Sequence, residues 1–134
     1  MAKTTKLVRD EAYEAMGMAY QCVQAAMLDA ALQEHGVADP AVRRQVCETF
    51  VFGMGNLHDQ GWFKPSHESE PVYPLLCFTT QFLNVDSPVG KLGTVYAPSG
   101  GFAYHESAFG CVGEFYEDAN VVETGDFGDG TDDA

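Results

Sequence analysis

The sequence EHGVADP, residues 34 to 40, separates two predicted helices and so decides the fold of the first half of the chain. Gly36 ends the first helix, because a left-handed residue commonly follows a helix and glycine adopts that conformation without strain. Asp39 and Pro40 begin the second helix, since aspartate accepts hydrogen bonds from free N–H groups and proline fixes φ at the first helical position. The link is short, so the sequence predicts an antiparallel helical hairpin.

The first predicted helix covers about residues 7 to 35. Its polar residues fall on one narrow face, which consists of Asp10, Glu14, Gln21 and Gln24 with Gly17 between them. The remaining surface is apolar and wider than the stripe of an ordinary amphipathic helix, so we expect this helix to be buried on most of its circumference. The second helix and a sheet would cover it in a monomer, whereas a neighbouring copy would cover it in a homo-oligomer.

The second predicted helix carries apolar residues at helical spacing and ends between Asn56 and Gly61; these residues are Val42, Val46, Phe50, Met54 and Leu57. Beyond Lys64, prolines, β-branched residues and aromatic residues replace the helical periodicity. The predicted strands there cover residues 72–85, 92–96, 102–104 and 111–116. The sequence therefore predicts one α+β domain over residues 1 to 117, in which the helical hairpin packs on a small antiparallel β-sheet.

Acidic residues dominate the C-terminal third of the chain. The whole sequence has 7 basic and 20 acidic residues and a net charge of −13, of which residues 92 to 134 contribute −9. Residues 118 to 134 are acidic and poor in apolar side chains, so we expect a disordered tail.

This charge excludes several classes of partner and favours another. Nucleic acids and anionic membranes are bound by neutralising phosphates with Lys and Arg, of which this chain has only 7 against 20 acidic residues. An acidic chain instead associates rapidly with a cationic surface, so the first functional hypothesis is a non-catalytic regulatory protein that docks on a basic protein partner. The alternative is that the acidic tail only supplies solubility or reflects a high-salt habitat.

Histidine stands next to a carboxylate three times, at His58-Asp59, His67-Glu68 and His105-Glu106. Imidazole and carboxylate groups are common ligands of zinc and iron, so a second hypothesis is a divalent metal site or metal-dependent enzyme that uses His58, His67, His105 and Glu106. No spacing places two of these histidines on one helix face. Three separate surface histidines are therefore the favoured interpretation, and no catalytic residue or other cofactor is assigned.

The four cysteines, Cys22, Cys47, Cys77 and Cys111, form no Cys-x-x-Cys pair and lie in apolar surroundings. This pattern favours buried thiols over a zinc knuckle, a thioredoxin-type redox site or a nucleophile paired with a histidine. No segment reaches the ~18 apolar residues that span a bilayer. We therefore expect a cytoplasmic protein.

Trp62 and Phe63 follow the second predicted helix in a segment flanked by glycine and proline. Large aromatic residues dominate protein interfaces, so these two could anchor a partner. They could equally fold back and seal the core where helix meets sheet, and the sequence favours this second interpretation.

Overall fold

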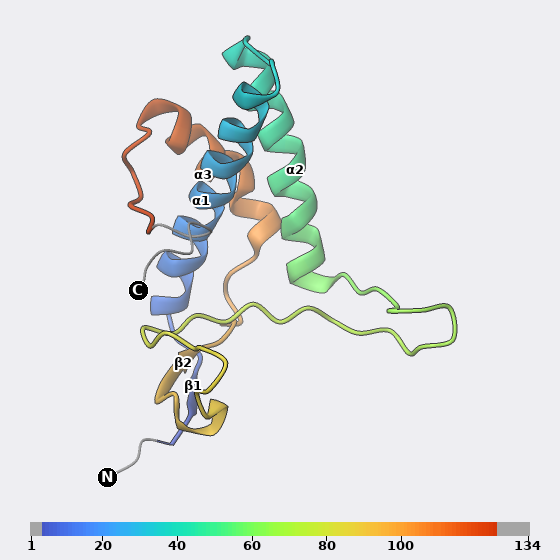
Figure 1. Ribbon diagram of the computed structural model, residues 1–134, viewed down its shortest axis with the longest axis vertical. Coiled ribbons are helices and arrows are strands. Elements are labelled where there is room, and N and C mark those ends of the chain that lie inside the picture. The colour runs from blue at the N-terminus through green and yellow to red at the C-terminus, as the bar shows by residue number, and fades with distance from the viewer. Residues whose placement is uncertain (1–3, 126–134) are drawn as a thin grey trace.

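The computed structural model describes residues 4 to 125 and has a mixed α+β fold (Figure 1). In chain order its elements are β1 (Lys6–Val8), α1 (Ala12–Glu34), α2 (Pro40–Gln60), the short 3-10 helix η1 (Val89–Lys91), β2 (Thr94–Tyr96) and α3 (Tyr104–Glu117). Most of the predicted tail, residues 126 to 134, lies outside the described residues.

The predicted end of α1 and the predicted start of α2 are confirmed, whereas α1 begins at Ala12 rather than near residue 7 because Lys6–Val8 form β1. Gly36 has a φ of 94°, the left-handed conformation that stops α1. Asp39 is the N-cap of α2, where its carboxylate accepts a hydrogen bond of 2.9 Å from the Ala41 N–H, and Pro40 occupies the first helical position. The two helices run in opposite directions side by side (Figure 1).

The prediction of a strand at Cys111–Tyr116 is wrong, because this segment belongs to α3. The buried residues of α3 recur at helical spacing and include Tyr104, Ala108, Cys111, Val112 and Phe115. Through this face α3 packs on both α1 and α2. The resulting core joins all three helices and contains Ala25, Cys47, Val51, Ala108, Val112 and Phe115.

The predicted antiparallel sheet is also wrong. The sheet has two strands, and they are parallel: β1 pairs with β2 in the register Lys6↔Thr94, Leu7↔Val95, Val8↔Tyr96. Residues 72–85 contribute only isolated bridges, from Val72 and Phe78, and no continuous strand. Within the described residues the helices pack chiefly on one another, so packing of the hairpin on the sheet is not confirmed.

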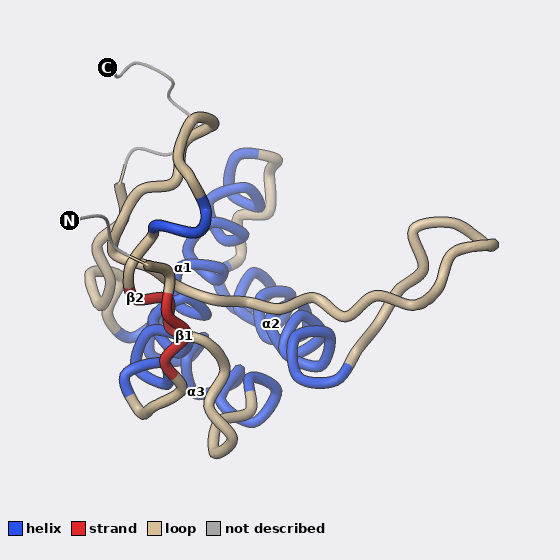
Figure 2. Tube along the Cα trace, turned by 90° about the horizontal axis from the view of Figure 1, so that it is seen from below, coloured by secondary structure: helices blue, strands red, loops and turns tan. Residues whose placement is uncertain are grey.

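Residues 62–75 form an arm that projects from the helical body (Figure 2). Phe63 and Val72 exchange two backbone hydrogen bonds, of 3.0 and 2.8 Å, which hold the two limbs of the arm together. Trp62 and Phe63 are half exposed. The interpretation that these aromatic residues seal the core is therefore wrong. None of the described helices is both long and apolar enough to cross a bilayer.

Candidate functional site

The carboxylate of Asp59 joins the end of α2 to the beginning of α3. It accepts hydrogen bonds of 2.8 Å from the backbone N–H groups of Tyr104 and His105, and one of its oxygens lies 2.5 Å from His105 Nδ1. Ala103, the N-cap of α3, has no polar side chain. Asp59 therefore supplies from another helix the capping group and the negative charge that a helix N-terminus requires.

Behind this pair, a chain of buried polar groups crosses from α1 to α3. Gln21 donates from Nε2 to the carbonyl oxygen of Tyr104 at 2.8 Å, and Ser107 donates to Gln21 Oε1 at 2.5 Å. Tyr104 donates to the hydroxyl of Tyr13 at 2.7 Å, and Tyr13 donates in turn to the carbonyl of Leu76. The predicted solvent face of α1 is thus wrong at Gln21 and at Gly17, both of which are buried. Burial raises the pKa of both tyrosines, so their hydroxyls stay protonated.

His58 lies beside this chain, with its ring against Tyr20 and Tyr104 at centroid distances of 6.4 and 5.6 Å. Both ring nitrogens are shielded from solvent and have no hydrogen-bond partner among the described residues. Desolvation lowers the pKa of His58, and the nearby charge of Asp59 only partly opposes this effect. The folded protein therefore holds this imidazole neutral.

We expect His58→Phe to leave stability unchanged or raise it by about 1 kcal/mol at neutral pH, because an aromatic ring of similar shape replaces two unpaired polar atoms. In the unfolded chain His58 takes up a proton below its ordinary pKa of 6.5, whereas in the folded state it resists doing so until lower pH. The wild type therefore loses stability as pH falls below 6.5, and the variant should lose less.

Urea unfolding at neutral and mildly acidic pH measures this difference. His67→Gln is the control, because His67 is exposed in the arm. An identical loss of stability on acidification in His58→Phe and in the wild type would contradict the assignment of this titration to His58.

The four predicted metal ligands are not brought together as one site. His58 lies near the end of α2, and His105 and the exposed Glu106 lie in the first turn of α3, whereas His67 is exposed in the arm. Among the described residues, no group of three or more His, Cys, Asp or Glu side chains is placed to hold a metal ion. The geometry therefore gives the metal-site hypothesis no support.

The Asp59–His105 pair resembles the carboxylate–imidazole half of a catalytic site. A carboxylate at Nδ1 fixes the ring and leaves Nε2 to act as a base. Catalysis of this kind also needs a nucleophile within hydrogen-bond reach. Within residues 4 to 125 no serine or cysteine side chain is hydrogen-bonded to His105, and the Ser107 hydroxyl is engaged by Gln21. What the contacts of Asp59 do show is a helix junction, because its carboxylate at the end of α2 caps the N-terminus of α3.

The cysteines agree with the expectation of buried thiols at three of four positions: Cys22, Cys47 and Cys111 are buried, and Cys77 is intermediate. All four are free. Burial is the main cause of a raised pKa at each of them, and it raises the pKa of Cys22 to about 12. Because only the thiolate is nucleophilic, the raised pKa lowers the reactivity of these thiols at neutral pH.

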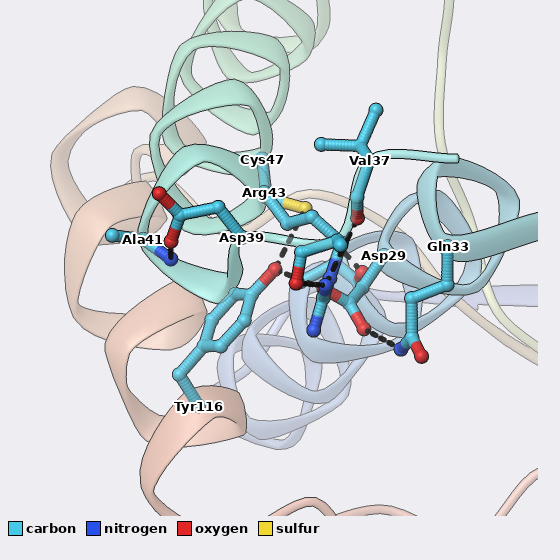
Figure 3. A network of polar contacts seen from close by, with 10 residues as sticks. Asp29, Gln33, Val37, Asp39, Ala41, Arg43, Cys47 and Tyr116 are labelled. Atoms are coloured by element: carbon cyan, nitrogen blue, oxygen red, sulfur yellow. Dashed lines mark hydrogen bonds and ion pairs between the residues drawn. The ribbon is translucent and has the colours of Figure 1, made fainter. Parts of the chain in front are cut away.

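A second polar network, which the sequence analysis did not identify, surrounds Asp29 near the tip of the hairpin (Figure 3). Asp29 Oδ1 accepts from Arg43 Nε at 2.7 Å and from the Tyr116 hydroxyl at 2.5 Å, while Oδ2 accepts from Gln33 at 2.7 Å. Burial opposes ionisation of Asp29, but these hydrogen bonds outweigh it and lower the pKa. The network joins all three helices and is buried, so its role is structural.

Comparison with family models, with curated proteins and with solved structures found no match for this chain. The class that the structure defines is a small α+β domain dominated by three helices.

Proposed function

We propose that this protein is a non-catalytic binding protein that docks on a basic protein partner. The observation that carries the proposal is the charge at the end of α3. Residues 114 to 125 contain four acidic side chains and no basic one, and all four are exposed: Glu114, Glu117, Asp118 and Glu123.

These carboxylates lie at a helix end where the local electrostatics disfavour negative charge. The last turn of a helix carries the negative end of its dipole and favours Lys or Arg, yet α3 has no basic residue there. Within residues 4 to 125 the ion pairs are Arg43–Asp29, Arg44–Glu48 and His105–Asp59, so none neutralises this end of α3. A cationic partner would relieve the repulsion and would also be steered toward this surface.

A charge-neutralised variant tests the proposal. The full chain and its Glu114→Gln/Glu117→Gln/Asp118→Asn variant are immobilised and exposed at low salt to an extract of the cells that make the protein. We expect the wild type to retain proteins with a pI above about 9, released by salt, and the variant to bind them about tenfold more weakly. The matched control is Glu11→Gln/Glu34→Gln/Asp86→Asn, which removes the same charge from exposed positions elsewhere.

Two results would contradict the proposal. One is that no basic protein is retained. The other is that the α3 variant and the control lose the same affinity, which would mean that net charge rather than this surface controls binding.

A further inference from the structure

The arm, residues 62–75, carries large apolar side chains that its own fold does not cover. They are between 41% and 68% exposed and comprise Trp62, Phe63, Val72, Tyr73 and Leu75. A hairpin that a single bridge holds together, without a supporting layer, is marginal in water, and exposed apolar patches mark interaction sites. An arm of this composition, projecting from the body, therefore has the features of an interaction site (Figure 2).

The same chain offers a surface for the arm along α1 and α2. Val42, Val46 and Phe50 lie at every fourth residue of α2, and with Met27 of α1 they are 38% to 51% exposed. Two hollows of about 430 and about 350 Å³ are lined by residues of these helices, and Phe50 belongs to both hollows. We call this surface the α1/α2 groove. Each hollow is larger than the ~150 Å³ cavity that accommodates a benzene ring.

Charge favours a second copy as the occupant. Every residue that lines either hollow is uncharged, and so are the five apolar residues of the arm. The contact would therefore desolvate no charge. In a chain with a net charge of −13, the arm carries a net charge of only −1, from Lys64 against Glu68 and Glu70. Arm and groove can thus approach each other without the repulsion that opposes contact between the acidic surfaces of two copies.

We propose that two copies exchange arms, so that the arm of each lies in the α1/α2 groove of the other. The arm leaves the body after Gln60, whereas Val42, Val46 and Phe50 lie in the first half of α2, roughly 15–25 Å away along the helix. In a two-fold pair with antiparallel hairpins, the base of each arm faces the groove of the partner. The exchange is reciprocal and closed, and it does not use the acidic end of α3, so it is independent of the proposed function.

Sedimentation velocity on the full chain, from about 5 to about 200 µM, tests the exchange because dimerisation depends on concentration. We expect the wild type to reach a dimer of about 29 kDa and to dissociate on dilution. Trp62→Ser/Phe63→Ser removes the anchors of the arm, and Val46→Glu places a charge in the groove. Each should raise the dimer Kd by about tenfold or more. Phe82→Ser, at a highly exposed residue outside both surfaces, should leave it unchanged.

Mixing the arm variant, Trp62→Ser/Phe63→Ser, with the groove variant, Val46→Glu, gives the decisive result. The arm variant has an intact groove and the groove variant has an intact arm, so an equimolar mixture should contain more dimer than either variant alone. Unchanged circular dichroism shows that each variant is folded. The proposed arm exchange is overturned if the wild type is monomeric or forms an open-ended series of oligomers. It is also overturned if the arm variant or the groove variant dimerises like the wild type, or if Phe82→Ser loses the dimer. The last contradicting result is a mixture that contains no more dimer than either variant alone. The charge variant of α3 should dimerise normally, which separates this test from that of the proposed function.

Discussion

Asp29→Ala is expected to lower the free energy of unfolding by about 3–5 kcal/mol, because it removes one partner of a buried ion pair. The side chains of Asp29 and Arg43 are only 9% and 12% exposed. Arg43 keeps its hydrogen bonds to the carbonyls of Val37 and Ala38 but loses its counter-ion. The Tyr116 hydroxyl also loses its acceptor. Since small domains are stable by about 5–15 kcal/mol, a large part of the total would be lost.

Urea unfolding followed by far-ultraviolet circular dichroism measures this loss. Glu48→Ala is the control, because the Arg44–Glu48 pair lies on the same hairpin but is partly exposed, and its removal should cost only about 0.3–0.5 kcal/mol. Equal effects of the two substitutions would contradict the structural role of the Asp29 network.

The effect of Asp29 should also depend on pH. Its folded-state pKa lies below the ordinary 3.8, so the carboxylate contributes stability above that value and loses it as pH falls through the folded-state pKa. The difference between the wild type and Asp29→Ala should therefore shrink in strong acid. A difference that stays constant down to about pH 2 would show that lost packing, rather than the ionised carboxylate, accounts for the loss.

The sequence was sufficient to predict the structure where residues close together in the chain decide it. Gly36, Asp39 and Pro40 predict helix ends from backbone chemistry that acts within a few residues, and the structure confirms them. The parallel pairing of β1 with β2 joins residues 88 positions apart, as in Lys6↔Thr94. Nothing near Lys6 indicates that partner, so the segment was assigned to the first helix.

Tertiary partners account for the other errors. The sequence places Gln21 on the polar face of the first helix and so predicts that it faces solvent, but Tyr104 and Ser107 supply hydrogen bonds to its amide in the interior. The segment Cys111–Tyr116, which contains two aromatic residues and one valine, was predicted as a strand. It is helical because α3 packs on α1 and α2, and contacts of this kind override local propensity.

The candidate site was predictable only in its residue types. His58-Asp59 and His105 were identified from the sequence, and the structure does bring Asp59 and His105 together. Their arrangement differs from the predicted metal centre because the carboxylate of Asp59 is also bound to backbone N–H groups of α3. The distant His67, in contrast, belongs to the arm. The spacing of these residues along the sequence does not show which of the three histidine–carboxylate dipeptides come together in the fold.

Gly55→Ala is expected to destabilise the protein by about 1–3 kcal/mol, because α2 and α3 approach too closely there for a side chain. A Cβ at Gly55 would lie 2.7 Å from the His105 nitrogen and 2.8 Å from the carbonyl carbon of Tyr104. Both contacts are to backbone, so the first turn of α3 would have to move. That movement would also stretch the hydrogen bonds from these two residues to Asp59.

Gly53 provides a control of opposite sign on the same helix. A Cβ there meets no atom within 4 Å, so Gly53→Ala should gain up to about 1 kcal/mol from the higher helix propensity of alanine. Urea unfolding compares the two variants directly, since each adds one methyl group to α2. If both substitutions stabilised the protein, α3 would not be packed against Gly55 as described. If both destabilised it, the cost would have to arise from α2 itself. Changes of opposite sign in the free energy of unfolding of the two variants are expected only when the backbone of α3 occupies the space beside Gly55.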